Sequence, residues 1–146
     1  MSDNDSFSYE LLTALLKKDV YKFEKLINGY LKSAVSYYDS TEAFYHGLML
    51  GLLALTGGFY TVKSNRESGF GRFDIALFPV MENYPGYVFE FKVAEAGDSL
   101  ETKAEEAISQ IIDKDYAWEL KDAGVGEIKI IGISFRGKEA VIKSRS

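Results

Sequence analysis

Residues 87–93, with the sequence YVFEFKV, constrain the fold of this chain more than any other segment. Every position of this run is apolar or aromatic except Glu90 and Lys92. Side chains alternate across a β-strand, so these two charges share one face with Val88, about 7 Å apart, and the other face is apolar. Charges in an otherwise apolar strand are costly unless they are paired or bind a metal. The run therefore predicts a strand with one face in the core. Its other face carries either a polar site or an exposed Glu–Lys pair.

The composition is that of a single globular domain. The chain has 146 residues, 47% of them hydrophobic and 14% aromatic, which suffices for one buried core. The absence of cysteine excludes disulfides and thiolate metal sites and fits a reducing compartment. The N-terminus is polar, without a signal peptide, and the apolar residues 47–59 are interrupted by glycines and too short for a membrane span. We therefore expect a cytoplasmic protein with no membrane partner.

The N-terminal part of the sequence has the apolar periodicity of helices. Apolar residues recur at helical spacing over residues 6–38 and indicate two helices separated near residues 18–19. A third helix should begin near residues 39–41, where Asp39 followed by Glu42 resembles a capping box, and it should end at the glycines after Thr56. A basic stripe on the second helix is interpreted as a solvated face rather than as a phosphate-binding surface.

The hydrophobic pattern then changes to that of strands. Residues 65–71 are polar and contain glycine, which predicts a turn. We expect strands at residues 59–63, 72–78, 87–93, 129–135 and, at an edge, 139–143, and one long helix at residues 100–123 with Trp118 facing inward. The order of elements, a helix, three strands, a helix and a strand, predicts an α/β fold.

Asp74 supplies a second carboxylate close to this central strand. It belongs to the strand expected at residues 72–78, and the loop at residues 79–86 would join that strand to the next as a hairpin. If the two strands pair in this way, Asp74 lies beside Glu90.

Such a pair of acids has a definite chemistry. Two carboxylates and the backbone carbonyl of Phe91 can bind Mg²⁺ or Mn²⁺, and the ion lowers the pKa of a bound water. Lys92 is placed to orient or help deprotonate that water, or to neutralise the transition state. The pattern points to metal-dependent phosphodiester cleavage. The net charge of −5 argues against strong nonspecific nucleic-acid binding, but it does not exclude a nuclease, because the ion offsets the catalytic acids locally.

Residues 71–74 (GRFD) and 90–92 (EFK), in this order of helices and strands, resemble the PD-(D/E)XK nuclease superfamily. The resemblance implies a restriction-endonuclease-like α/β core: a helix, a three-stranded meander, a helix and a strand. That core would occupy residues 39–146, behind an N-terminal helical extension at residues 1–38. The usual proline before the aspartate is replaced by Phe73 in this sequence.

A second set of segments narrows the resemblance. Residues 42–47 (EAFYHG), 69–74 (GFGRFD) and 107–116 are similar to the nuclease-like domain at the C-terminus of a bacterial AAA-ATPase-like family. The similarity covers about residues 15–142 of the sequence. No Walker-type glycine-rich loop is present, so the chain is interpreted as a C-terminal domain or a stand-alone relative, with an attached or separate ATPase as a partner.

The resemblance also implies roles for individual residues. Asp74 and Glu90 would be metal ligands and Lys92 the catalytic lysine. Glu42 would complete the site from the first core helix, although it also fits the N3 position of a capping box. Gln110, on the helix after the third strand, would approach the site or the nucleic acid. Its alternative is a solvated helix face shared with two lysines.

His46, the only histidine, lies one helical turn after Glu42. We interpret it as a capping or core-edge histidine rather than as part of a Glu–His metal pair. A Ser/His/Asp hydrolase is not expected, because no nucleophile motif surrounds this histidine.

The sequence thus favours a Mg²⁺-dependent nuclease domain that acts on DNA rather than RNA. The alternative is a catalytically weak or inactive nuclease-fold module that binds or regulates within a larger ATPase-containing protein. The intact Asp74, Glu90 and Lys92 favour the first hypothesis, and the acidic net charge favours the second. A homodimer is a third alternative, with a seam formed by exposed aromatics such as Tyr37, Tyr38 and Tyr84.

Overall fold

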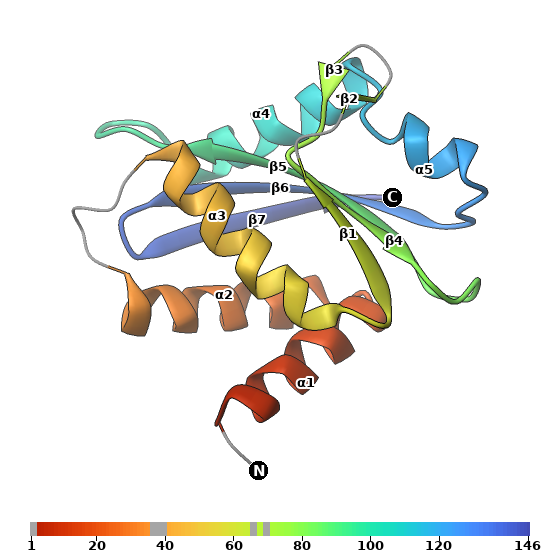
Figure 1. Ribbon diagram of the computed structural model, residues 1–146. Coiled ribbons are helices and arrows are strands. Elements are labelled where there is room, and N and C mark those ends of the chain that lie inside the picture. Colours follow the sequence, from red (N-terminus) through yellow and green to blue (C-terminus); the bar gives the residue numbers. More distant parts are fainter. Residues whose placement is uncertain (1–2, 36–40, 65–66, 69–70) are drawn as a thin grey trace.

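The computed structural model describes residues 3–35, 41–64, 67–68 and 71–146 and has a mixed α/β architecture (Figure 1). A five-stranded sheet lies between two layers of helices. The helices are α1 (Asp3–Leu16), α2 (Val20–Ala34), α3 (Glu42–Leu53), the 3₁₀ turn η1 (Ala54–Thr56), α4 (Leu100–Asp113) and α5 (Trp118–Asp122). The strands are β1 (Tyr60–Ser64), β2 (Glu67–Ser68), β3 (Gly71–Arg72), β4 (Ile75–Pro79), β5 (Gly86–Val93), β6 (Ile128–Arg136) and β7 (Glu139–Arg145).

The sheet has the order β1-β4-β5-β6-β7. Strands β1, β4 and β5 form an antiparallel meander, and β6 returns parallel to β5 after the crossover through α4 and α5. Strand β7 pairs antiparallel with β6 at the edge. This architecture confirms the predicted restriction-endonuclease-like core, which is preceded in the chain by N-terminal helices. Among the helices that the structure describes, none combines the length and the hydropathy of a membrane span.

Strand β5 alternates between two cores as its sequence predicts. Tyr87, Phe89 and Phe91 pack into the larger core, which the sheet shares with α1, α2 and α3. Val88 faces the other way, into a smaller core with residues of α4 and α5. Glu90 lies on this second face and is only 5% exposed. A carboxyl group is therefore buried on the face that α4 covers.

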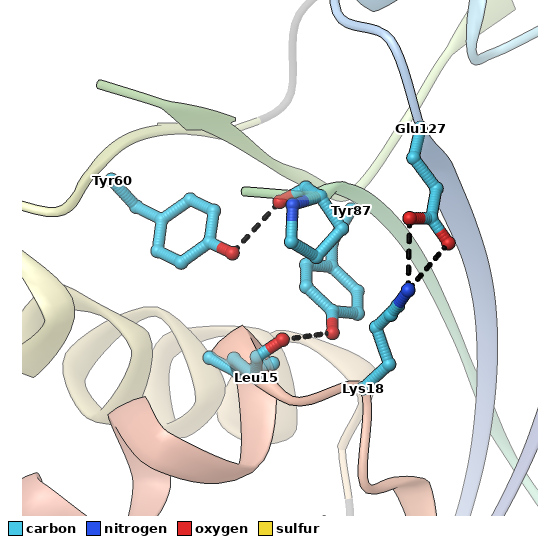
Figure 2. Close-up of polar contacts among 6 residues, drawn as sticks. Leu15, Lys18, Tyr60, Tyr87 and Glu127 are labelled. Carbon is cyan, nitrogen blue, oxygen red and sulfur yellow. Dashed lines mark hydrogen bonds and ion pairs between the residues drawn. The ribbon is translucent and has the colours of Figure 1, made fainter. Parts of the chain in front are cut away.

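The two N-terminal helices are attached to the sheet by polar contacts as well as by the core. The chain turns between α1 and α2 at Lys18, which has a positive φ of 58°, and the break predicted near residues 18–19 is confirmed. Tyr87 on β5 donates its hydroxyl to the Leu15 carbonyl at 2.5 Å, and Lys18 pairs with Glu127 at 2.9 Å (Figure 2). The Leu15 carbonyl belongs to the last turn of α1, where helix carbonyls lack the usual i+4 donor, and it also accepts the Lys18 amide at 3.2 Å.

Two segments differ from the sequence expectation. The turn predicted at residues 65–71 contains β2 and the first residue of β3, and these two strands pair with each other outside the main sheet. The helix predicted at residues 100–123 is divided into α4 and α5 by Asp115, whose φ is 51°. Aspartate tolerates this left-handed conformation better than most residues. The helix can therefore end here without a glycine or proline in the sequence. Trp118 begins α5 and is 48% exposed, so its predicted inward orientation is wrong.

Helix α3 begins where the sequence predicts, but its cap is not the predicted capping box. Thr41, not Asp39, is the N-cap, and its side chain accepts the Phe44 amide at 3.1 Å. Glu42 is the first residue of the helix and not the N3 position of a capping box. Asp39, Tyr37 and Tyr38 lie outside the described residues, and Tyr84 of the predicted dimer seam is half-buried. The domain boundary predicted between residues 38 and 39 falls in the same undescribed stretch and stays a prediction.

Candidate active site

The site is positioned by the point at which strand pairing stops. Among the described residues, β4 pairs with β5 only from Ile75 opposite Phe89 to Leu77 opposite Tyr87, whereas β6 pairs along the whole of β5. The second half of β5, from Glu90 onward, therefore has no β4 partner in the described register. This stretch of β5 can present backbone groups to side chains or ligands instead of to a strand.

Asp74 occupies the place where that partner would be. It lies at a bend just before β4, and not within a strand at residues 72–78 as the sequence predicts. Its amide donates to the Phe89 carbonyl at 3.2 Å, and its Oδ2 accepts the Phe91 amide at 2.8 Å. The two bonds fix both the backbone and the carboxylate of Asp74 against β5. The carboxylate thereby lies beside the Glu90 side chain, as the hairpin predicts.

Glu90 is coupled to Asp74. Burial, followed by a side-chain hydrogen bond to Asp74 and by the negative charge of Asp74, raises the pKa of Glu90 to about 9. The positive charge of Lys92 lowers this pKa, and the negative charge of Glu42 adds a smaller increase. At neutral pH and without a cation, Glu90 therefore holds a proton and is hydrogen-bonded to Asp74. A divalent cation would neutralise the same pair in place of that proton.

Lys92 lies on the same face of β5, at one end of a chain of hydrogen bonds. Its Nζ donates to Gln110 Oε1 at 2.5 Å, and Gln110 Nε2 donates to the Tyr116 hydroxyl at 3.0 Å. Gln110 is thus half-buried and directed at the site, rather than part of a solvated face of α4. The sequence placed Gln110 near the site but gave no role to Tyr116.

Helix α3, which lies beside the sheet (Figure 1), brings His46 to Asp74. His46 Nδ1 is 3.8 Å from Asp74 Oδ1, its Nε2 lies 2.7 Å from Ser64 Oγ, and its ring meets Phe91 edge-on at 5.9 Å. The histidine is therefore a neighbour of the candidate site as well as a core-edge residue. Its spacing of one helical turn from Glu42 was the signal in the sequence.

The contacts of His46 with Ser64 on one side and Asp74 on the other resemble the arrangement of a serine-hydrolase triad. The geometry does not favour that chemistry. The separation of 3.8 Å between His46 and Asp74 is too long for the hydrogen bond that orients a catalytic histidine. The other oxygen of Asp74 is occupied by the Phe91 amide. Ser64 itself is the last residue of β1 rather than part of a sharp strand-to-helix turn.

The donor groups fit a hard divalent cation. Asp74 and Glu90 contribute carboxylate oxygens that already meet in a hydrogen bond. The Phe91 amide points at Asp74. Because the N–H and C=O of one strand residue point to the same side of the strand, the Phe91 carbonyl also faces the side on which Asp74 lies. Oxygen donors of this kind suit Mg²⁺ or Mn²⁺. Within the described ranges, no three acidic, histidine or cysteine side chains converge as an ion-binding group, so waters would have to complete the coordination.

Glu42 lies at the rim of this arrangement. It is exposed at the first position of α3, and its charge reaches Glu90. An acidic side chain in the first turn of a helix is also favoured by the helix dipole, so the position needs no catalytic explanation.

Comparison with known proteins agrees with this geometry. A family model described as the PD-(D/E)XK nuclease superfamily matches residues 40–145, from just before α3 through β7. This chain belongs to the PD-(D/E)XK nuclease superfamily. A search of curated proteins found no match. The superfamily match makes this a nuclease-type domain, and nucleases of the superfamily typically use divalent metal ions. The match includes all the site residues described above, from Glu42 to Tyr116.

Proposed function

We propose that this chain is a divalent-metal-dependent nuclease domain in which Asp74, Glu90 and the Phe91 carbonyl hold Mg²⁺ or Mn²⁺. The observation that supports this most strongly is the pairing of the Asp74 and Glu90 carboxyl groups, with Lys92 on the same face of β5. The proximity of Asp74 raises the pKa of Glu90, because two negative charges so close together repel each other. A divalent cation bound between them would remove this repulsion. A purely structural face would not need this arrangement.

The residues around the ion position have separate tasks. A divalent cation bound there supplies a lowered water pKa and a charge that stabilises the phosphate. Lys92, held by Gln110, directs its ammonium group toward the attacking water or the phosphate oxygens. Glu42 adds a negative charge at the open rim, from which it can reach a water or an ion. Gln110 acts through Lys92 and can also contact the nucleic acid.

We propose DNA rather than RNA as the substrate, on the basis of superfamily resemblance. The net charge of −5 gives little long-range attraction for a polyanion, so binding would depend strongly on the bound ion. The same charge supports a second candidate function, a weakly active or inactive module that serves an attached or partner ATPase. Cation binding without cleavage would favour this second candidate.

Cleavage assays separate these proposals. Supercoiled, linear and single-stranded DNA and a matched RNA would be incubated with the purified chain in Mg²⁺, Mn²⁺ or EDTA. We expect ion-dependent cleavage of DNA that is lost in Asp74→Asn and Lys92→Met. Lys22→Met is the matched control, because Lys22 is an exposed lysine on α2 that pairs with Glu10 at 3.5 Å, away from the site. Wild-type protein that neither cleaves nor binds the ions would refute the proposed function.

A further inference from the structure

The turn after α4 returns the chain to the helix that it has just left. The Tyr116 amide donates to the Ile111 carbonyl at 3.0 Å, and the preceding Asp115 has a positive φ of 51°. Tyr116 is therefore brought back against the last turns of α4 and is only 6% exposed. Its ring packs in the smaller core with Ile111 and Leu120. The position of its hydroxyl is determined by this turn and by the core together.

That hydroxyl meets Gln110, the side chain to which Lys92 donates its hydrogen bond. A glutamine amide has an acceptor end and a donor end, whereas a lysine ammonium has only donors. Gln110 must therefore present Oε1 to Lys92, which leaves Nε2 to donate to Tyr116, as the distances of 2.5 and 3.0 Å show. A reversed amide would place the Nε2 donors of Gln110 against the donors of the Lys92 ammonium group. Lys92 thus selects this orientation of the Gln110 amide, and the Tyr116 hydroxyl holds the amide in place by accepting from Nε2.

We propose that Tyr116 is a positioning residue of this site, which holds Gln110 so that its Oε1 fixes the ammonium group of Lys92. The restraint confines a long, flexible side chain to the face of β5 that carries Glu90. Positioning of this kind affects the chemical step more than the binding of substrate. The catalytic consequence rests on the proposed nuclease function, whereas the restraint on Lys92 does not.

Tyr116→Phe removes the hydroxyl and keeps the buried ring. The matched control is Tyr60→Phe, because the Tyr60 hydroxyl is also buried and donates to the Pro85 carbonyl at 2.7 Å, outside the candidate site. The first readout is trace acetylation of Lys92 followed by mass spectrometry, with Lys22 as the internal reference. We expect Lys92 labelling to rise about fivefold in Tyr116→Phe and to stay unchanged in Tyr60→Phe. Unchanged Lys92 labelling in Tyr116→Phe would overturn the proposal.

The second readout is kinetic. In Mg²⁺ we expect Tyr116→Phe to lower kcat about fivefold with KM unchanged, and to have no further effect in a Gln110→Ala background. Raised labelling with an unchanged kcat would overturn the catalytic role. Additive losses in the double variant would overturn the route through Gln110. If the wild-type chain does not cleave, the nuclease function fails, and the labelling result alone still decides whether Tyr116 restrains Lys92.

Discussion

Replacing Glu90 with glutamine should change how the free energy of unfolding depends on pH. In the folded protein the pKa of Glu90 is about 9, above the ordinary value of 4.5 that it recovers on unfolding. Between these values the folded state holds a proton that the unfolded state has released. The free energy of unfolding of the wild type therefore falls as pH rises, by at most about 1.4 kcal/mol per pH unit. Glutamine cannot titrate, so Glu90→Gln lacks this contribution.

The expected difference is large enough to measure. From pH 5.5 to 8.5 the wild type should lose up to about 4 kcal/mol relative to Glu90→Gln, because one proton is held over three units. The assay is urea unfolding in EDTA at several pH values. Glu10→Gln is the control, because Glu10 is 44% exposed and lies on α1, away from Asp74. A stability difference between the wild type and Glu90→Gln that stays constant across this pH range would refute the coupling of the two acids.

Other predictions concern the scaffold. Tyr87→Phe should lower the free energy of unfolding by about 1 kcal/mol, because the Leu15 carbonyl at the end of α1 loses the buried Tyr87 hydroxyl and keeps only the Lys18 amide; urea unfolding at constant pH measures this. Gly132→Ala should destabilise by about 3 kcal/mol or more, because a Cβ there would lie 2.3 Å from the Ala104 carbonyl oxygen of α4. Gly29→Ala on α2, where a Cβ meets nothing within 4 Å, should instead stabilise by about 0.5–1 kcal/mol. Equal effects of the two glycine changes in thermal unfolding would contradict the close approach of α4 to β6.

The sequence predicted those parts of the molecule that depend on local periodicity. The alternation in residues 87–93 correctly predicts that Glu90 and Lys92 share one face, because successive side chains of a strand point to opposite faces. The same pattern could not show where β4 stops pairing with β5, because pairing depends on both strands. Asp74 was therefore expected inside a strand, whereas it precedes β4 and binds the Phe91 amide with its side chain.

The contacts of His46 and Tyr116 also depend on tertiary structure. His46 reaches Asp74 only because α3 lies beside β5, and its sequence spacing from Glu42 gave a hint but not a partner. Tyr116 reaches Gln110 because Asp115 adopts a left-handed conformation after α4. A sequence without glycine or proline at that point gives no reason to end the helix there.

The account depends most on the claim that Asp74 and Glu90 hold one divalent cation together. Calorimetric titration with Mn²⁺ at pH 7, in buffers of different ionisation enthalpy, measures the number of ions bound and the protons released. We predict one ion per chain and about one released proton in the wild type, with binding weakened at least tenfold in Asp74→Asn and in Glu90→Gln but not in Glu10→Gln. Mn²⁺ binding that is absent, or that survives both site substitutions unchanged, would contradict the account.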